Sequence, residues 1–525
     1  MDEFETKQKR VCLSMGFDRI SQLPQQIIHH ILFFMPTKDA ARTSALSKSW
    51  LQAWNSLPRF DLKHSDVTHY DPLNLSNGEE VDIDHEEMFS KFAKSVDETL
   101  LPLQLYKAII PLFKLRVTVW HDKYASRIDN WLELAYRNHV QTLDLDIRSK
   151  DNVKAYALPQ TTFGVGSLAV LSLKGEKCKL DKNYFSYDMK SLCLRELSLD
   201  EVDVDSLTIK KILKCCPLLE ALTITMCTKV KRVELVNVPK LKKANVQGVN
   251  KLRIEAPNLE KLNCSGDLAP ILNPNSIACN NVKEIEIASF YLTKKMIREF
   301  DSKFPLLETL HLGIFFGRKE FKFSSHRLKS LSLSPGPEKL TTVEIDCENL
   351  NSFKYNGSSI PSSFSITSSC LNNIENRFHQ KGHLDTFWFL TLRQYLGKFE
   401  QHQTLNLWFD HPTTISFTSE ELSKDQLPPL SSLENLVLER VPPMQDYTAL
   451  VDGLLWICHP KLLSAYPVYS GVQFTNFLCQ TLVNREEEPK CCGDSHMKCW
   501  RHYLISGAPT PQIPLKSSIL LEWSL

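Results

Sequence analysis

A short segment near the C-terminus, EEEPKCCGDSHMKCWRHY at residues 486–503, concentrates side chains that could bind a metal ion. The candidate ligands are Cys491, Cys492, His496, Cys499 and His502. Thiolates and imidazoles are the usual zinc ligands, but a structural zinc site pairs two ligand units at a defined separation. A RING finger needs two interleaved ligand sets. Because the spacing here is irregular and the sequence has no second cluster, we expect no metal site and no resident cofactor, with zinc as the alternative.

Other local patterns that could carry chemistry are incomplete. Gly164 and Gly166 resemble a dinucleotide-binding loop, but the third glycine and the ribose-binding acid are missing, so we interpret them as a turn. His29 and His30 are interpreted as a partly exposed pair within a helix. The sequence has no nucleophile elbow, P-loop or HExxH motif. A site assembled from distant residues stays open, but we expect a protein without catalytic activity.

Basic residues recur in the middle of the chain and raise the question of an anion-binding patch. They are Lys210-Lys211, Lys229, Lys231-Arg232 and Lys242-Lys243. We interpret them as solvated outer faces of strands; the alternative is a positive patch for an acidic peptide or a phosphate-bearing small molecule. The formal net charge of +1 produces no strong field. We therefore expect neither nucleic acid nor a membrane as a partner.

Composition and targeting signals favour a soluble intracellular protein. The chain has 525 residues, 42% hydrophobic and 23% charged, which suits several domains or one long repeat array. The N-terminal sequence MDEFETKQKR lacks the apolar core of a secretory signal, and no apolar run is long enough to span a membrane. The 15 cysteines are then expected to be reduced and mostly buried. We expect the protein in the cytoplasm, the nucleus or both.

Residues 20–54 contain three short amphipathic segments in a stretch too small to bury its own apolar side chains. Apolar residues recur at helical spacing in two stripes, Leu23, Pro24, Ile27, Ile28, Ile31 and Leu32 in the first and Leu46, Trp50, Leu51 and Trp54 in the second. Pro36 ends the first helix and Thr37 is placed to cap the next. Below about 40 residues a domain usually needs disulfides, a metal or a partner. No cysteine falls in this window, so we expect a partner to cover the surplus.

This segment resembles the F-box of plant proteins. The match runs through Leu23-Pro24, Pro36-Thr37-Lys38-Asp39-Ala40, Arg42-Thr43-Ser44 and Leu46-Ser47-Lys48-Ser49-Trp50. The resemblance implies docking onto a Skp-type adaptor, which connects to a cullin scaffold carrying a RING subunit. The residues that we assign to adaptor binding are Leu23, Pro24, Ile28, Ile31, Leu32, Leu46 and Trp50. Some of them must instead hold the three helices together, and the sequence does not separate the two roles.

A pattern L-x-x-L-x-L recurs through the rest of the chain. The copies are Val140-Leu143-Leu145, Leu168-Leu171-Leu173, Leu194-Leu197-Leu199, Leu219-Leu222-Ile224, Leu259-Leu262-Cys264, Leu307-Leu310-Leu312, Leu328-Leu331-Leu333 and Leu433-Leu436-Leu438. Three copies share a longer signature, Pro-x-Leu-Glu-x-Leu, beginning at Pro217, Pro257 and Pro305. The repetition predicts one strand per repeat, with alternate side chains pointing into a continuous core.

These repeats resemble leucine-rich repeats, and the whole order resembles the plant F-box/LRR group, some members of which end in an FBD domain. Residues 128–147 are similar to that group's first repeat, a helix leading into a strand. Two-residue alternations between Leu222 and Leu262 predict an extended convex side there, whereas residues 205–216 have a helical period. Residues 386–399 predict a helix under the last repeats, and residues 449–458 and 471–482 predict closing helices.

We therefore expect an α/β protein with a three-helix F-box followed by an irregular leucine-rich-repeat solenoid, with parallel strands on the concave face and a mixed helical and extended convex face. The expected boundaries are a flexible tail at 1–15, the F-box at 16–62, a polar linker at 63–100 with one short helix around Met88–Val96, the solenoid with closing helices at 101–484, and a Cys- and His-bearing tail at 485–525.

The resemblance implies a non-catalytic adaptor: the substrate-recognition subunit of a Skp–cullin–F-box (SCF) ubiquitin ligase. The F-box would bind the adaptor and the repeats would bind an unknown target protein. Strand geometry and analogy predict target contacts at Thr223, Thr225, Asn263, His311 and Lys329. The alternative is an F-box/LRR scaffold that binds a protein or a small ligand without ubiquitination.

Overall fold

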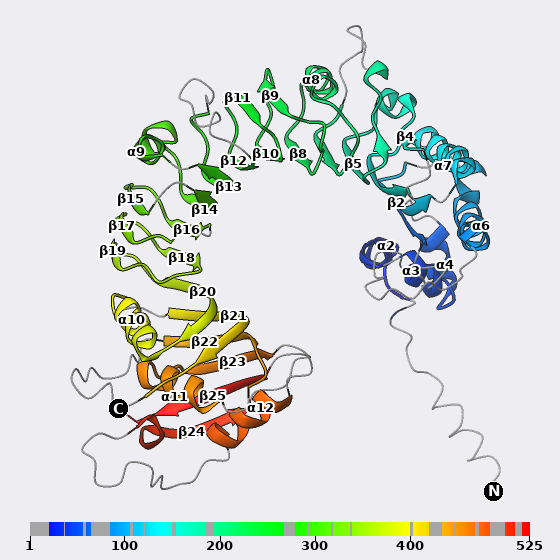
Figure 1. Ribbon diagram of the computed structural model, residues 1–525. Helices are drawn as coiled ribbons and strands as arrows, with labels where there is room; N and C mark the ends of the chain where they lie inside the picture. The colour runs from blue at the N-terminus through cyan, green and yellow to red at the C-terminus, as the bar shows by residue number, and fades with distance from the viewer. Residues whose placement is uncertain are drawn as a thin grey trace, which may run out of the picture. The chain divides into compact units, whose positions relative to one another are not determined.

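The structure is a computed structural model, and it describes most of the chain (Figure 1). The described residues are 20, 22–35, 37–55, 59–64, 85–105, 109–119, 121–149, 154–184, 193–266, 279–291, 293–316, 319–336, 339–399, 403–418, 433–444, 447–467, 472–483, 499–509 and 517–524. They divide into two compact units, Met1–Gly248 and Val249–Leu525, which are treated separately below.

The described part of the first unit begins with three short helices, α2 (Gln25–Phe34), α3 (Thr37–Thr43) and α4 (Lys48–Asn55). Parallel strands follow, paired in the order β1 (Arg59–Lys63), β2 (Leu112–Val119), β3 (Thr142–Ser149), β5 (Val170–Lys174), β7 (Glu196–Asp200), β8 (Ala221–Thr225) and β10 (Lys243–Gln247). On the other side of the core lie helices α6 (His85–Leu105), α7 (Ala125–Arg137) and α8 (Ser206–Cys215), with short strands β4 (Tyr156–Ala157), β6 (Cys178–Lys179) and β9 (Arg232–Val236) (Figure 1).

The second unit continues the same plan. Its parallel strands pair in the order β12 (Lys261–Ser265), β13 (Glu284–Tyr291), β14 (Thr309–Phe316), β16 (Ser330–Pro335), β18 (Ser352–Gly357), β20 (Asn373–Leu384), β21 (Gln403–Ile415), β22 (Leu433–Val441) and β23 (Leu462–Pro467). The opposite wall contains β11 (Lys251–Glu255), helices α9 (Lys294–Lys303), α10 (Thr386–Leu396), α11 (Thr448–Ile457) and α12 (Val472–Leu478), and a second parallel sheet of β15 (Glu320–Ser324), β17 (Thr342–Asp346) and β19 (Ser363–Thr367) (Figure 1).

The leucine pattern builds the core as predicted. Every residue of the L-x-x-L-x-L copies is buried, with at most 3% of its surface exposed. In the first unit, strand register stacks the last apolar position of successive repeats in one row: Leu115, Leu145, Leu173, Leu199, Ile224 and Val246. Each strand therefore contributes one layer to a continuous apolar core.

The wall opposite the strands alternates between helix and extended chain, also as predicted. Asp205 caps α8 by accepting a hydrogen bond of 2.7 Å from the Thr208 amide. Residues 226–266, all described, contain strands and turns without a helix. The predicted helix at 386–399 is α10, and the first predicted closing helix is α11. The second is α12 with a following π-helical turn, Cys479–Val483.

The described residues of the expected polar linker at 63–100, namely 63–64 and 85–100, lie in or next to regular elements. Residues 59–63 form β1, which pairs with β2, and residues 85–105 form the long helix α6. A buried stripe at helical spacing explains this helix: Phe89, Phe92, Ala93, Val96 and Leu100. Phe89 stacks on Tyr124 with ring centroids 3.7 Å apart. The short helix expected around Met88–Val96 is therefore part of a longer one. The expected tail at 1–15 lies outside the described residues.

The expected tail at 485–525 also differs from the structure, because it completes the second unit. Strand β25 (Ser517–Trp523) pairs antiparallel with β23, and β24 (Leu504–Pro509) pairs with β25. Trp500 is 1% exposed, and its Nε1 donates a 2.8 Å hydrogen bond to Asp452 on α11. Arg501 donates a second bond of 2.8 Å to the same carboxylate. These contacts attach the Cys-Trp-Arg-His segment to the closing helix.

Candidate functional site

The three N-terminal helices pack around a small apolar core. Ile28 and Leu32 of α2 are fully buried, and Trp50 of α4 is 3% exposed. The Trp50 Nε1 donates a hydrogen bond of 3.1 Å to the Ile20 carbonyl. Leu23 is half-buried and packs against the same cluster. The structure therefore places three of the residues assigned to adaptor binding inside the subdomain, where they hold the helices together.

The same subdomain presents a second set of apolar side chains to solvent. This docking patch consists of Ile27 (45% exposed), Ile31 (36%), Phe34 (70%), Leu46 (55%) and Leu51 (45%). Ile27, Ile31 and Phe34 follow one another at i, i+4 and i+7, so they share one face of α2. His30 contacts Phe34 edge-to-face, with ring centroids 5.0 Å apart. Exposed apolar clusters of this kind mark interaction sites.

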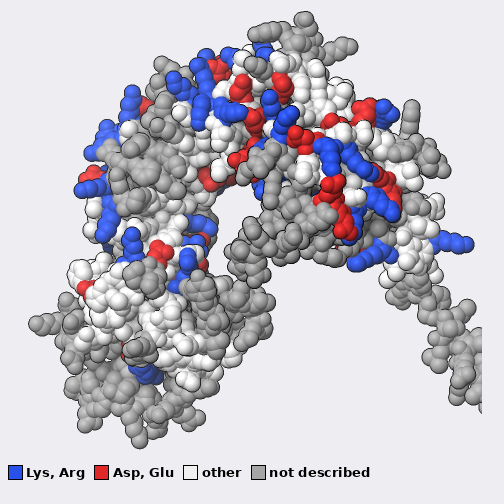
Figure 2. All heavy atoms as spheres, turned by 45° about the vertical axis from the view of Figure 1, so that its right-hand side comes forward, with Lys and Arg blue, Asp and Glu red and all other residues white. Residues whose placement is uncertain are grey.

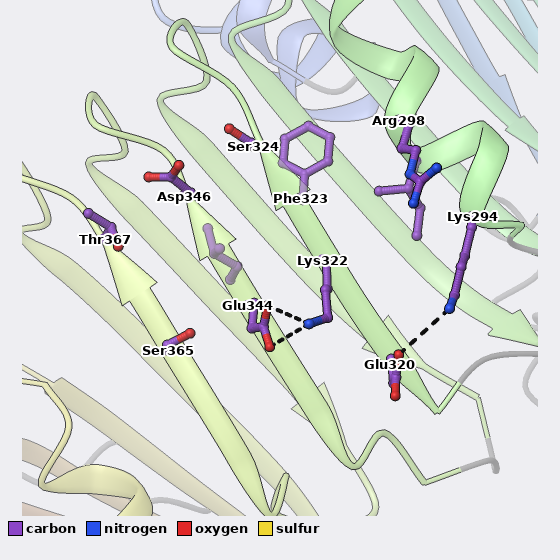
Figure 3. A pocket seen from close by; sticks show the side chains of 12 residues that line it. Lys294, Arg298, Glu320, Lys322, Phe323, Ser324, Glu344, Asp346, Ser365 and Thr367 are labelled. Atoms are coloured by element: carbon purple, nitrogen blue, oxygen red, sulfur yellow. Dashed lines mark hydrogen bonds and ion pairs between the residues drawn. The ribbon is translucent and has the colours of Figure 1, made fainter.

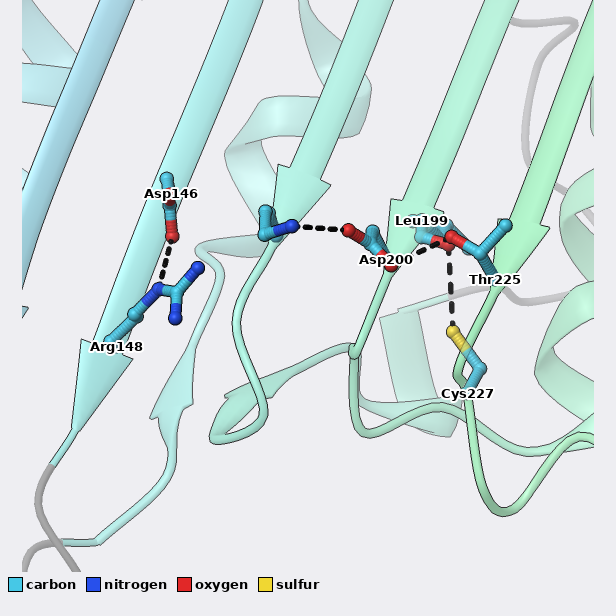
Figure 4. A network of polar contacts seen from close by, with 7 residues as sticks. Asp146, Arg148, Leu199, Asp200, Thr225 and Cys227 are labelled. Carbon is cyan, nitrogen blue, oxygen red and sulfur yellow. Dashed lines mark hydrogen bonds and ion pairs between the residues drawn. The ribbon is translucent and has the colours of Figure 1, made fainter. Parts of the chain in front are cut away.

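The parallel strands of each unit have an open face, the side that points away from the core. In the first unit, Thr223 and Thr225 lie on this face of β8, beside Ser198 and Asp200 of β7. Thr225 Oγ1 donates a 2.7 Å hydrogen bond to Asp200 Oδ1 (Figure 4). Lys174 of β5 forms an ion pair of 2.6 Å with the other oxygen of Asp200.

Electrostatics along this row are balanced within the protein. Burial raises the pKa of Asp200, but hydrogen bonds from Lys174 and Thr225 outweigh it and bring the pKa below its usual value. On the neighbouring strand β3, Arg148 pairs with Asp146 at 3.0 Å (Figure 4). The row therefore offers a target hydrogen-bonding groups of both signs, with little net charge.

In the second unit, Asn263 and His311 flank Glu286 on adjacent strands in one register row. Asn263 Nδ2 donates a 2.7 Å hydrogen bond to Glu286 Oε2. Lys329 instead precedes β16 and pairs at 3.1 Å with Glu308, which precedes β14. Of the predicted target contacts, the structure thus brings together Asn263 with His311 and, in the other unit, Thr223 with Thr225.

An open groove of about 800 Å³ lies on the other wall of the second unit (Figure 3). Helix α9 forms one side, with Lys294 and Arg298, and the strands β15, β17 and β19 form the floor. On this floor Lys322 pairs with Glu344 at 2.7 Å. This second sheet was not predicted, because short strands with alternating apolar residues have the same sequence pattern on either wall.

Four of the seven basic residues that raised the question of an anion-binding patch form ion pairs with carboxylates of the first unit. Lys210 pairs with Glu234 at 2.8 Å, Lys229 with Asp203 at 2.6 Å, Arg232 with Glu234 at 2.6 Å, and Lys242 with Glu220 at 3.0 Å. Figure 2 shows Lys and Arg side chains interspersed with Asp and Glu over the repeats. This arrangement favours the interpretation as solvated outer faces over a phosphate-binding patch.

Thiol and metal chemistry has little support in the described part of the chain. Its cysteines are free thiols, and none of its His, Cys, Asp and Glu side chains form a group of three that could hold a metal. Cys227 donates a hydrogen bond to the Leu199 carbonyl, and burial raises its pKa to about 11 (Figure 4). Cys499 is buried, whereas Cys491, Cys492 and His496 lie outside the described residues.

Two family models match the chain: the F-box domain at residues 20–62, and the LRR repeats of the FBD-associated F-box protein At5g56370 at residues 128–330. Among curated proteins of Arabidopsis thaliana, the F-box protein At5g03100 is 31% identical over 250 residues, covering 47% of this chain and 69% of the relative. The chain belongs to the plant F-box/LRR-repeat family.

Two further curated relatives of this F-box/LRR-repeat protein are named as F-box/LRR-repeat proteins. The F-box/LRR-repeat protein At3g58940 is 28% identical over 301 residues, covering 53% of this chain and 46% of the relative. The F-box/LRR-repeat protein At5g02910 is 26% identical over 379 residues, covering 65% of this chain and 75% of the relative. The chain thus spans less than half of At3g58940. Neither matching family model describes a catalytic domain.

Sequence reasoning did not assign several residues of the docking patch on this F-box/LRR-repeat protein to adaptor binding. Ile27, Phe34 and Leu51 are exposed on the F-box helices but were absent from the predicted set. The available signal was the i, i+4, i+7 spacing of Ile27, Ile31 and Phe34, which defines a face distinct from that of Ile28 and Leu32.

No described helix of the chain is long and apolar enough to cross a membrane.

Proposed function

We propose that this F-box/LRR-repeat protein is the substrate-recognition subunit of an SCF ubiquitin ligase. In this proposal the F-box binds a Skp-type adaptor, which connects to cullin and the RING subunit, and the repeats bind a target protein. The protein itself performs no chemistry; it holds a target lysine close to an activated ubiquitin. We propose that it acts in the cytoplasm, the nucleus or both.

The docking patch is the observation that carries the adaptor-binding part of the proposal. Its five side chains are at least 36% exposed, although the subdomain already has a core of its own. Leaving such apolar surface in water is unfavourable, and covering it gains roughly 25 cal/mol per Å². A partner that covers the patch would therefore be bound tightly. Membership of the F-box family supports a Skp-type adaptor as that partner.

The repeats support the target-binding part. Their open face presents polar side chains on every second strand position, such as Ser198, Thr223 and Asp200 in the first unit. Repeat arrays build extended binding surfaces from such positions, since the core fixes the backbone while the open face is free to vary. The alternative, a scaffold that recruits no ligase, keeps the same repeats and lacks adaptor binding.

A pair of substitutions tests adaptor binding directly. The double variant Ile27→Glu with Ile31→Glu places charges on the exposed face of α2 and leaves the buried Ile28 and Leu32 intact. We expect its affinity for a Skp-type adaptor to fall at least about a hundredfold, because two charges must be desolvated at the interface. Isothermal titration calorimetry of the full chain with the purified adaptor measures this change.

The matched control is Leu207→Glu, which changes an apolar residue on α8 that is 54% exposed. It should bind the adaptor as tightly as the unsubstituted chain. Equal affinities for the F-box variant and the control would reject the docking patch as the adaptor interface. Absence of adaptor binding by the unsubstituted chain would favour the scaffold alternative.

A further inference from the structure

The open face of the second unit changes character at strands β20, β21 and β22. Upstream, on β16 and the start of β18, it carries small side chains such as Ser330, Ser332 and Ser352. On β20–β22 it carries large charged and aromatic ones. We call this group the Trp408 cluster; its members are Arg377, His379, Asn406, Trp408, Glu439 and Arg440.

Glu439 is the centre of the cluster. Its Oε1 accepts hydrogen bonds from Arg377 Nη2, at 2.9 Å, and from Asn406 Nδ2. The Glu439 side chain is 17% exposed and the Arg377 side chain is 35% exposed, so this ion pair is partly shielded from water. The charge of Arg377 is balanced by Glu439 within the protein.

Trp408 lies beside Glu439 and presents its ring on the open face. His379 contacts the ring, with centroids 5.8 Å apart, and hydrogen-bonds Asn356 at 2.9 Å. Burial lowers the pKa of His379, so the imidazole is neutral near pH 7. The indole Nε1 donates a 3.0 Å hydrogen bond to Asp410. These neighbours fix the orientation of the indole ring.

Arg440 supplies a cation that no carboxylate in the described chain neutralises. Its guanidinium lies over the Trp408 ring, 5.1 Å from the centroid, and the residue is exposed. Its φ of 57° is in the left-handed region, at a register shift between Glu439 and Val441. A left-handed backbone is unfavourable for a non-glycine residue. Here it accompanies the register shift at which the Arg440 guanidinium lies over the indole.

We propose that the Trp408 cluster is the recognition subsite for the target, and that it takes an extended acidic peptide segment. A carboxylate of the target pairs with Arg440, and the side chain next to it packs on the Trp408 ring. This inference rests on the proposed function, because it names the substrate chemistry of the same repeats. It moves the centre of target binding away from Thr223, Asn263 and their neighbours to β20–β22.

The local charges favour a peptide over a nucleic acid. Glu375 and Glu439 on these strands are ion-paired with Lys354 and Arg377, and Asp410 accepts a hydrogen bond from Trp408, so the strands offer few free cations to a continuous phosphate backbone. A cation beside an aromatic ring suits an isolated carboxylate flanked by an apolar side chain. Tryptophan and arginine are also the residues that most often dominate protein–protein interfaces.

Selection from a random linear peptide library displayed on phage tests the proposal, with the full chain bound to its Skp-type adaptor as the target. We expect the enriched peptides to share an Asp or Glu next to an apolar residue. The affinity of one such synthetic peptide is then measured by fluorescence polarisation. Arg440→Asn should weaken it roughly fivefold or more, and Arg440→Lys less. Asparagine is suitable because it tolerates the left-handed backbone.

The matched control is Arg298→Asn, which removes an exposed arginine from α9 on the opposite wall and should leave peptide affinity unchanged. Enriched peptides without a shared acidic residue, failure to enrich any peptide, or equal affinities for the Arg440 and Arg298 variants would overturn the proposal. Competition by single-stranded RNA instead of acidic peptide would overturn it as well. The affinity of the chain for the adaptor is measured separately, and the affinity for the peptide is also measured with the chain alone. A chain that binds the peptide but not the adaptor would contradict the proposed function, whereas a chain that binds the adaptor but no acidic peptide would contradict only this inference.

Discussion

At the scale of single residues, the F-box contains buried apolar side chains and exposed ones, and the sequence alone does not tell them apart. Ile27 and Ile31 recur four residues apart, and so do Ile28 and Leu32. Helical periodicity therefore marks both faces of α2 as apolar and cannot say which is covered. Packing against Trp50 decides it, since Ile28 and Leu32 are fully buried while Ile27 and Ile31 are exposed.

This division predicts a large loss of stability for one substitution and almost none for its neighbour. Ile28→Ala should lower the free energy of local unfolding of the F-box by roughly 2–5 kcal/mol, because it removes buried methylenes and leaves a cavity. Ile27→Ala should change it by about 0.5 kcal/mol or less, since the side chain is exposed in the free chain. Hydrogen exchange of the α2 and α4 amides in the full chain measures both values. Similar destabilisation by the two variants would contradict the assignment.

At the scale of elements, the parallel strands were predictable and the end of the array was not. The Leu-x-x-Leu-x-Leu pattern predicts the strand of each repeat, because each strand must add an equivalent layer to the core. The antiparallel strands β24 and β25 have no such constraint on spacing, so residues 504–523 lack the rhythm. The helix expected around Met88–Val96 is the middle of α6, which extends beyond it at both ends.

The closing element also predicts a pH dependence. His459 precedes β23 and stacks on Trp523 of β25, with ring centroids 4.0 Å apart and planes 5° apart. Burial lowers its pKa from 6.5 to about 4. Between these values the unfolded chain binds more protons than the folded chain, so stability should rise as pH increases through this window and fall as pH decreases.

The variant His459→Phe keeps a flat ring on Trp523 and removes the titration. We expect the urea midpoint of the unsubstituted chain to increase between about pH 4.5 and about pH 7 by more than that of the variant. Carboxylates titrate in both proteins, and their contribution cancels in the difference. Equal increases for the two proteins would show that His459 is not held neutral by burial.

At the scale of the whole molecule, the chain combines parts with separate tasks. The F-box exposes the docking patch, an apolar surface that needs a partner, and the repeats expose rows of polar side chains on a rigid sheet. The leucine pattern and the F-box resemblance predicted this organisation. The Trp408 cluster was not predicted, because strands β20–β22 bring its residues together from positions up to 63 apart, Arg377 to Arg440, and no local motif links them.

The most direct test of the central claim is co-expression of the full chain with a Skp-type adaptor, followed by size-exclusion chromatography with light scattering. The account predicts a stable one-to-one complex, because the docking patch on the F-box is covered when the adaptor binds. A well-behaved chain that elutes alone in the presence of excess adaptor would contradict the substrate-receptor function and leave the repeats as a scaffold without a ligase.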